Sequence, residues 1–583
     1  MRNVLYRASA AARHTVLLPP RQTRTFPTTG QLLVEGGDAR IALDPYSGAN
    51  RYGCTPFPDP GMAAYGSTTA SAISDPAFRA ADRLRDRLAG TPGGARAALY
   101  VRELERMRLE LAQLSGAPGA EIIFAASGTD IHLIAASLVR TIHPVPPLVI
   151  MIDGTETGAG VPAAVTCRHF SSRSARGDSV AEGGPVGPDA ALPVATVAIR
   201  RADGSPLPSQ DIDAAVEKHA MQALARGRRV LLVLNDLSKT GMLVPSPACM
   251  AALRTAMPDR IDVLVDACQF RIAASTVRAY LEQGFMVALT GSKFLGGPSF
   301  SGALLIPQSA ADRFRQQSLG RAMSAYSARA EWPRNWQGAE LLDQVANPGL
   351  LLRWEAALAE LRALRAVPET EIRAFLRIFA TAIAGRLADD PLFRAVPVPD
   401  IDRRPLTGTD GWDSIPTIFP FLLRCSGVRA GTAFLGPEET QAVYRLIRTR
   451  LTDRPDLHLS RAEEKAAGLR CQLGQPVVCG SDGATPLSAL RLSVGARQII
   501  AATREGRAAR EIVDEALTVL DKTAWLVRAG LFRDLPRVGD PQPARHGEPA
   551  PAKCAAARSG ESGSTQLRTA SAATMVHRAF GQR

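Results

Sequence analysis

The chain has 583 residues, of which 46% are hydrophobic and 21% are charged. This composition is typical of a globular protein, excludes a wholly disordered chain, and at about 100–200 residues per domain predicts more than one folding unit. The formal net charge is +13, but only six of the 69 basic residues are lysines. Because the arginines are scattered and aromatic residues make up only 5%, we expect no nucleic-acid partner.

The eight cysteines form no C-x-x-C pair, which argues against a disulfide framework and against a zinc site. We therefore expect a reducing, cytoplasmic location and no bound metal. No run of about 18 or more apolar residues occurs, so we expect no membrane association. Residues 1–34 carry arginines and no acidic residue, as organellar targeting segments do; a ragged arginine-rich lead-in is the alternative.

From residue 120 onward, short apolar runs alternate with segments of helical period. This alternation predicts a mainly parallel sheet wrapped by helices. The expected strands span residues 121–126, 148–153, 195–200, 229–235, 262–267, 285–290 and 302–306. The expected helices span residues 130–141, 209–226, 246–257 and 275–283. Together they predict one large α/β domain over residues 50–330, after a partly flexible lead-in over residues 1–49.

Residues 331–536 predict a smaller C-terminal α/β domain. Its expected elements are two amphipathic helices within 350–387 broken near Pro368, an apolar run at 417–425, a helix with Glu438 in its first turn, an apolar run at 489–494 and a closing helix over 496–528. Residues 537–583 are rich in Pro, Gly, Ser and Ala without periodicity, which predicts a disordered tail.

Ser127-Gly128-Thr129 directly follows a predicted strand and directly precedes a helix. Backbone N–H groups and two hydroxyls therefore gather at the positive end of a helix dipole, an arrangement that suits a phosphate. A small-residue turn is also expected at this point of any α/β fold, so the turn alone leaves both interpretations open.

Asp266 ends an apolar run at the carboxyl edge of a predicted buried strand, where open α/β sheets bind ligands. A carboxylate there requires a cationic partner, because burying it unpaired raises its pKa or costs several kcal/mol. Capping of the following helix is the alternative role. Gln269, three residues later, adds a neutral donor and acceptor on the same rim.

Lys293 stands at the end of the next predicted strand, after Thr290-Gly291-Ser292 and before the turn Gly296-Gly297. Lysine is scarce in this chain, so its use here indicates chemistry that arginine cannot perform. A lysine can lose its proton and attack a carbonyl. The other lysines lie in helical or tail contexts, apart from Lys239 in a turn.

Taken together, these three features answer the three demands of pyridoxal 5′-phosphate. Its phosphate requires a helix terminus, its pyridinium nitrogen requires a carboxylate, and its aldehyde requires a lysine for the resting Schiff base. The sequence therefore predicts this coenzyme as the cofactor.

With these motifs the chain resembles the class V aminotransferases and cysteine desulfurases, a family of fold type I pyridoxal-phosphate enzymes. Ser127-Gly128-Thr129 looks like the family's phosphate-cup turn, and Asp266-Ala267-Cys268-Gln269 is similar to its Asp-x-x-Gln/His element. Ser292-Lys293, followed by Gly296-Gly297-Pro298 and Gly302-Ala303, looks like its lysine loop and return strand. The resemblance spans about residues 50–530 in element order, and it implies a homodimer.

The resemblance also implies a role for each matched residue. Lys293 would form the Schiff base and later move protons, Asp266 would hold the ring nitrogen, and Gln269 would lie near the ring oxygen. The residues that would contact the coenzyme are Ser127, Gly128, Thr129, Thr157, Asn235, Asp266, Gln269, Thr290, Ser292 and Lys293.

Two stretches depart from the family's pattern. The family's ring-stacking histidine has no counterpart in residues 153–158, where Thr157 would make a lighter contact. The family's Asn-Glu-Thr-Gly segment is represented by the longer stretch 235–241, in which either Asn235 or Ser238 could reach the ring oxygen.

Leu490-Arg491-Leu492-Ser493 resembles the family's strand whose arginine grips the substrate carboxylate. A planar guanidinium on a rigid strand suits that task, and a surface ion pair is the alternative. Residues 50–53 and 65–69 form polar, glycine-bearing segments that shape the substrate pocket in such enzymes; simple surface loops are the alternative.

The leading hypothesis for the function is an aminotransferase acting on an amino acid, with Lys293 moving the proton. A cysteine desulfurase or selenocysteine lyase is an alternative, and it requires a mobile cysteine such as Cys479, for which burial in a core is the commoner fate. A catalytically retired binding protein is a second alternative, supported only by the missing stacking histidine.

Overall fold

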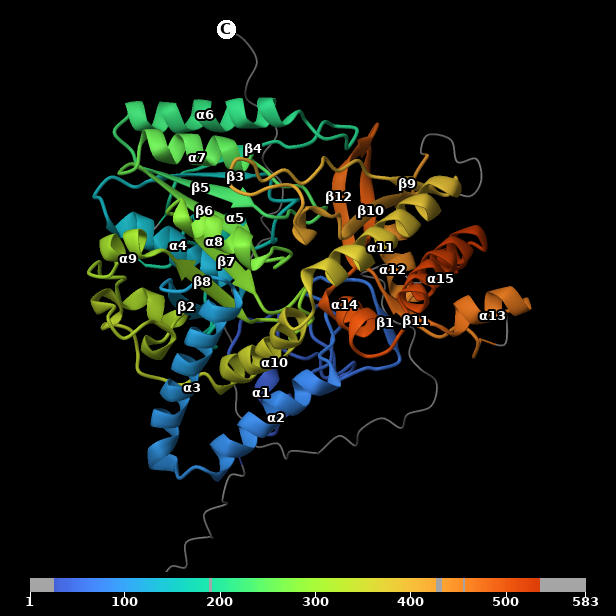
Figure 1. Ribbon diagram of the computed structural model, residues 1–583, viewed down its shortest axis with the longest axis horizontal. Coiled ribbons are helices and arrows are strands. Elements are labelled where there is room, and N and C mark those ends of the chain that lie inside the picture. The colour runs from blue at the N-terminus through green and yellow to red at the C-terminus, as the bar shows by residue number, and fades with distance from the viewer. Residues whose placement is uncertain (1–25, 188–190, 426–432, 455–456, 535–583) are drawn as a thin grey trace, which may run out of the picture. The chain divides into compact units, whose positions relative to one another are not determined.

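The computed structural model of the protein describes residues 26–187, 191–425, 433–454 and 457–534 (Figure 1). The chain divides into two compact units, Met1–Leu535 and Pro536–Arg583. The predicted tail over residues 537–583 and most of the arginine-rich segment 1–34 lie outside the described residues. The domain boundaries expected from the sequence stay predictions.

Seven strands form one sheet. They are β2 (Glu121–Ala125), β3 (Leu148–Ile152), β4 (Val194–Val197), β5 (Val230–Asn235), β6 (Ile261–Ala267), β7 (Met286–Thr290) and β8 (Gly302–Ile306). Their spatial order is β2-β8-β7-β6-β5-β3-β4. Strand β8 runs antiparallel to its two neighbours, β2 and β7, and the other neighbouring pairs of these seven strands are parallel. The expected mixed α/β fold with a mainly parallel seven-stranded sheet is confirmed.

Helices pack on both faces of this sheet (Figure 1). One face meets α4 (Gly128–Thr141), α5 (Val161–Val165) and α9 (Gln308–Phe314), and the other meets α6 (Ser209–Ala225), α7 (Pro247–Ala256) and α8 (Ala274–Glu282). Alternation along each strand decides which side chain joins which face: Ile123 of β2 packs on the first and Phe124 on the second. The central strand β6 is buried at every position, which explains its almost unbroken apolar sequence.

A second sheet contains four antiparallel strands from the C-terminal part of the chain. Its order is β12 (Gly474–Asp482), β13 (Thr485–Ser493), β10 (Ile418–Leu423) and β9 (Phe393–Ala395). Helices α11 (Glu369–Asp389) and α12 (Pro437–Leu446) pack against it, and α15 (Ala509–Arg528) packs against both helices. The helix break expected near Pro368 is present, because this proline caps α11 directly after α10 (Pro348–Arg365).

The early part of the chain crosses to the C-terminal part. Strand β1 (Met62–Ala64) pairs in parallel with β11 (Arg470–Gln472), and Tyr65 O accepts a hydrogen bond from Ser493 N at 2.7 Å. The remaining described α-helices are α1 (Thr29–Leu33), α2 (Asp75–Gly90), α3 (Gly93–Leu114), α13 (Arg461–Gly468) and α14 (Ala496–Thr503). Among the described residues, none of the helices combines the length and apolar character that crossing a membrane requires.

The single closing helix expected over residues 496–528 is wrong, because two helices, α14 and α15, occupy this stretch. Gly506 between them has φ +76°, a left-handed conformation that ends a helix. The amide of Arg504 donates to Ile500 O at 2.8 Å, a regular helical hydrogen bond at the C-terminal end of α14. The sequence carries a signal of this break, since residues 503–507 are polar and include Gly506.

Candidate active site

The carboxyl edge of the large sheet gathers the residues singled out in the sequence. Parallel pairing of β5 with β6 sets Asn235 opposite Asp266, and pairing of β6 with β7 sets Asp266 opposite Ala288. Thr290 ends β7, and Lys293 follows it in the loop toward β8. The candidate residues therefore share one edge because adjacent parallel strands end side by side.

Asp266 is buried and receives polar contacts from four segments. Its Oδ2 lies 3.3 Å from His132 Nε2 and accepts hydrogen bonds from Asn235 Nδ2 at 3.2 Å and from Thr157 Oγ1 at 3.5 Å. Its Oδ1 accepts from the amide of Cys268 at 3.2 Å. The alternative role as a helix cap does not apply, because Ala273 is the N-cap of the next helix, α8.

His132, in the second turn of α4, is the cationic partner that a buried Asp266 requires. Its Nδ1 lies 2.7 Å from Gly128 O, and its Nε2 faces the carboxylate of Asp266. Both neighbours are acceptors, so these surroundings favour a proton on each ring nitrogen, although Nε2 makes no well-aligned hydrogen bond to the carboxylate. Burial lowers the pKa of His132, but the carboxylate more than offsets this, and the pKa lies above its ordinary value.

The ionised state of Asp266 is strongly favoured. Burial raises the pKa of this carboxyl, yet the charge and hydrogen bond of His132, followed by the charge of Lys293, hold the pKa well below its usual range. A carboxylate that remains ionised at neutral pH can keep a protonated ring nitrogen bound opposite it.

Lys293 is half-buried, and its backbone is left-handed with φ +60°. A non-glycine residue in this conformation costs about 1–3 kcal/mol and persists only when its surroundings impose it. Gly296 N donates to Lys293 O at 3.0 Å, closing the turn. The charge of Lys293 acts on the pKa of Asp266, of His132 and of Lys239, which places its ammonium in the same site.

The turn at residues 127–129 lies against the ends of β6 and β7. A Cβ built on Gly128 would lie 2.9 Å from Cys268 Sγ and 3.2 Å from Thr290 Cγ2, so glycine allows this close approach. Ser127 caps α4, accepting from Asp130 N at 3.4 Å. The hydroxyls of Ser127 and Thr129 at this turn both contact Arg40.

Thr290 Oγ1 donates to Cys268 O at 2.6 Å, and Ser292 Oγ donates to Thr290 Oγ1 at 3.4 Å. Arg40 adds the cation, donating from Nη1 to Thr129 Oγ1 at 3.2 Å and from Nη2 to Ser127 Oγ at 3.3 Å. Four hydroxyls and one guanidinium thus lie together at the first turn of α4.

The environment of Arg40 holds its guanidinium in place and charged. Asp38 pairs with Nη2 at 2.6 Å, and the rings of Phe170 and Phe300 lie 5.5 and 5.2 Å from its Cζ. Burial lowers the pKa of Arg40, but the hydrogen bonds and charge of Asp38 raise it further, so the net shift is upward. The sequence pattern does not reveal this residue, because nothing local distinguishes it from 62 other arginines.

Glu156 ties the loop after β3 to the loop after β5. Its carboxylate accepts from Arg200 Nε at 2.7 Å, from Ser238 Oγ at 3.0 Å and from Thr240 N at 3.1 Å. Two residues, Asn235 and Ser238, were candidates for the contact with the ring oxygen. Ser238 donates to Glu156, whereas Asn235 donates to Asp266 and so lies beside it. The Oδ1 atom of Asn235 is buried without a hydrogen-bond partner in the described structure.

Arg491 reaches the same loops from strand β13. Its Nη1 donates to Lys239 O at 3.1 Å and its Nη2 to Gln475 O at 2.7 Å, while its Nε has no partner among the described residues. Burial lowers its pKa to about 10. The surface ion pair considered as an alternative is excluded, because the side chain is buried and pairs with no carboxylate within the described ranges.

The remaining candidates take different positions. Gln269, three residues after Asp266 in the chain, is buried, and its Oε1 has no hydrogen-bond partner among the described atoms. Cys479 lies in β12 within a small apolar cluster that includes Leu422 and Leu487, and burial raises the pKa of its thiol to about 11. Both early polar segments contact the site's surroundings. The ring of Tyr52 lies 6.5 Å from that of Phe300 and Tyr52 acts on the pKa of Arg40, and Ser67 O accepts from Arg271 at 3.3 Å.

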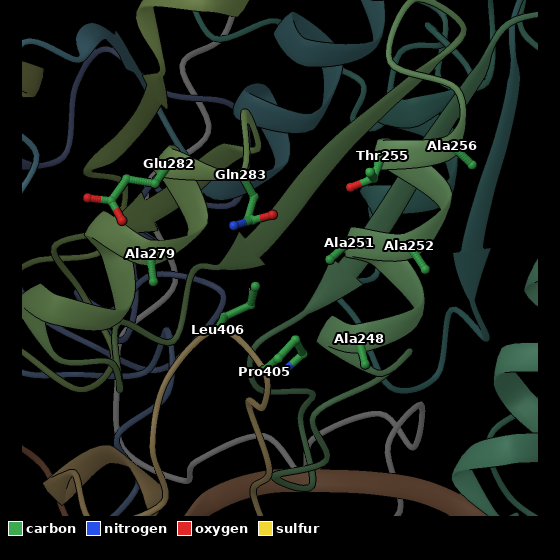
Figure 2. Close-up of a pocket in the computed structure, with 10 residues that line it drawn as sticks. All are labelled: Ala248, Ala251, Ala252, Thr255, Ala256, Ala279, Glu282, Gln283, Pro405 and Leu406. Carbon is green, nitrogen blue, oxygen red and sulfur yellow. The ribbon is translucent and has the colours of Figure 1, made fainter.

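A cavity of about 620 Å³ lies elsewhere, between α7 and α8 (Figure 2). Its lining is mostly small and apolar and includes Ala251, Ala279 and Leu406, with Glu282 as its one charged residue. None of the candidate residues lines it. The cavity therefore has no part in the site at the carboxyl edge of the sheet.

No family model matches the chain, and no curated protein matches its sequence. Among solved structures, the cysteine desulfurase CsdA from Escherichia coli is similar with 17% identity and a TM-score of 0.46, over 79% of this chain and 94% of that chain. Mouse CSAD is similar with 14% identity and a TM-score of 0.47, over 82% of this chain and 85% of that chain. A complex of Oryza sativa TDC with PLP and tryptamine is similar with 14% identity and a TM-score of 0.45, over 80% and 84%.

Proposed function

We propose that the protein is a pyridoxal-phosphate enzyme that acts on an amino acid, with an aminotransferase as the leading reaction. The observation that carries this proposal is the buried pair of Asp266 and His132 at the carboxyl end of β6, within the electrostatic reach of Lys293. An ionised carboxylate, a lysine and a phosphate cup on one sheet edge are the three groups that this coenzyme requires.

The residues present fit the coenzyme. The hydroxyl of Thr129 and the guanidinium of Arg40 supply donors for a phosphate at the start of α4. The hydroxyls of Ser127, Thr290 and Ser292 line the same place and would turn to the phosphate from the acceptors that they now bind. The unpartnered buried oxygens of Asn235 and Gln269 are acceptors that await a donor, and leaving such atoms unpaired costs about 1–3 kcal/mol each. A bound ring with polar substituents would supply those partners.

When bound, the coenzyme withdraws electrons from the α-carbon of an amino acid. The chain's own residues then have distinct tasks. Asp266, kept ionised by His132, holds the proton on the ring nitrogen. Lys293 moves a proton at its Nζ, and Arg491 orients the substrate through its carboxylate, so that the reacting bond is fixed relative to Lys293.

The packing of Cys479 favours transamination over desulfuration within this proposal. A desulfurase requires a thiolate that can move over the pocket, but this side chain is buried among apolar neighbours and its thiol is held protonated at neutral pH. We expect the Cys479→Ala variant to retain turnover of amino acids. Loss of sulfide release from cysteine in that variant would favour the desulfurase instead.

The visible absorption spectrum of the purified protein, reconstituted with pyridoxal phosphate, tests the cofactor assignment. We expect a band that disappears in Lys293→Ala and survives in Lys218→Ala, which changes an exposed lysine on α6. A panel of amino acids, scored by the spectral change of the half-reaction and by mass spectrometry of the 2-oxo acid, tests transamination. Absence of the band in the unmodified protein would overturn the proposal and favour a retired binding protein. The homodimer implied by the family resemblance stays a prediction, which sedimentation can check.

A further inference from the structure

Two cations beside the candidate site lack a carboxylate partner within the described residues. Arg491 donates only to the main-chain oxygens of Lys239 and Gln475. The Nζ of Lys239 donates to Thr155 O at 2.9 Å, which uses one of its three N–H groups. The hydrogen bonds of both side chains thus go to neutral main-chain oxygens, and neither forms an ion pair with a described carboxylate.

The nearest acid does not neutralise them. Glu156 acts on the pKa of both residues, but its two oxygens are already occupied by Arg200, Ser238 and Thr240. The pair of Glu156 with Arg200 is deeply buried, with side-chain exposures of 2% and 6%. Its charge is therefore matched largely by Arg200. Asp153 also raises the pKa of Lys239, but this exposed carboxylate accepts from Thr155 and forms no ion pair with either cation.

The two cations also repel each other. Burial and then the charge of Arg491 lower the pKa of Lys239 to about 8, with a further contribution from Lys293. Burying an ion without a counter-ion costs several kcal/mol, and a ligand that brings negative charge removes that cost. One monocarboxylate would satisfy Arg491 and leave the ammonium of Lys239 uncompensated.

Arg271 also lacks a carboxylate partner among the described residues, and the charge of Arg491 adds to burial in lowering its pKa, but three of its five N–H groups are bonded and the side chain is fully buried. Its guanidinium bonds to three main-chain oxygens, Val494 O at 2.8 Å, Ser67 O at 3.3 Å and Thr417 O at 3.4 Å. Lys239 differs, because it is half-buried, keeps two N–H groups uncommitted in the described structure, and sits on a flexible four-carbon stem. It is the cation that can reach a second acidic group.

We propose that the substrate is an amino acid with an acidic side chain, whose α-carboxylate binds Arg491 and whose distal acid binds the ammonium of Lys239. This inference rests on the proposed function, since it names the substrate class of that site. It distinguishes acidic amino acids from their amides, which match them in shape but lack the second charge.

The test compares two unreactive probes by calorimetry on protein reconstituted with pyridoxal phosphate: glutarate, with two carboxylates, and butyrate, with one. We expect glutarate to bind at least about tenfold more tightly, the equivalent of about 1.4 kcal/mol. In Lys239→Met this preference should disappear while butyrate affinity stays the same. Lys239→Arg should retain the preference, and Lys218→Met, a matched change at an exposed lysine, should behave as the unmodified protein.

Equal affinities for glutarate and butyrate in the unmodified protein would overturn the inference, whether or not Lys239→Met folds. An undiminished preference in Lys239→Met would also overturn it. The absorption band of the same samples separates this result from failure of the proposed function: with the band present and no preference, only the substrate class is wrong. With the band absent, the proposed function itself fails.

Discussion

The candidate site contains two charged regions that are built in opposite ways. At the end of β6, Asp266 and His132 form a matched pair whose charges cancel inside the protein. Arg491 of β13 and Lys239, in the loop after β5, form no ion pair with any described carboxylate. The first region is complete before any ligand arrives, whereas the second becomes electrostatically balanced only when an anion binds.

This difference separates residues that hold the fold from residues that wait for a ligand. Removing one member of a matched buried pair strands the other, so the folded protein loses stability. Removing a buried charge without a counter-ion removes its desolvation cost together with its hydrogen bonds, so the effect on the fold is smaller and the main loss is in binding. Neutralising substitutions should therefore destabilise the first region more than the second.

Asp266→Asn should give the largest effect. It leaves the imidazolium of His132 buried against a neutral amide, and breaking a buried pair in this way costs about 3–5 kcal/mol. Denaturant unfolding of the protein without coenzyme measures this loss. The double variant His132→Asn with Asp266→Asn should recover part of it, and a simple sum of the two single effects would contradict the pairing.

Arg491→Met should change stability less than Asp266→Asn does. The methionine removes a buried charge without a counter-ion, which favours folding, but it leaves Lys239 O and Gln475 O without this donor, so the two effects oppose each other in the free energy of unfolding. Butyrate affinity should fall by at least about tenfold. A loss of stability as large as that of Asp266→Asn would show that Arg491 is a structural cation.

The pH dependence of His132 should give the smallest effect. Its pKa is raised in the folded state, so its contribution to stability is complete below about pH 6.5, its ordinary pKa, and is lost as the pH rises through the raised value. The pKa of Asp266 is lowered, so this partner stays ionised throughout that window. The stability difference between the unmodified protein and His132→Gln should therefore shrink between mildly acidic and alkaline pH, as measured by urea unfolding. A difference independent of pH would contradict the charged state assigned to His132.

Much of the architecture follows from local sequence signals. The seven strands are β-branched and leucine-rich runs that end within a few residues of their predicted limits, because a buried strand needs apolar side chains on both faces. Gly506 is a local signal that the predicted single helix over 496–528 passed over, since a lone glycine can be tolerated inside a helix. Asp266 and Lys293 were recognisable because a strand-end acid and a scarce lysine stand out locally.

By itself, the amino-acid sequence determined the order of strands and helices, the turn at Ser127 and the strand-end positions of Asp266 and Lys293. Only the tertiary structure decided that His132 faces Asp266, that Arg40 contacts the turn at Ser127, and that Lys239 and Arg491 lie together without an ion-pair partner among the described residues. The physical reason is the separation along the sequence of the residues that each interaction joins. Helix and strand formation depend on neighbours along the chain, whereas a buried charge is stabilised by groups that are distant in sequence and meet only when the chain is packed.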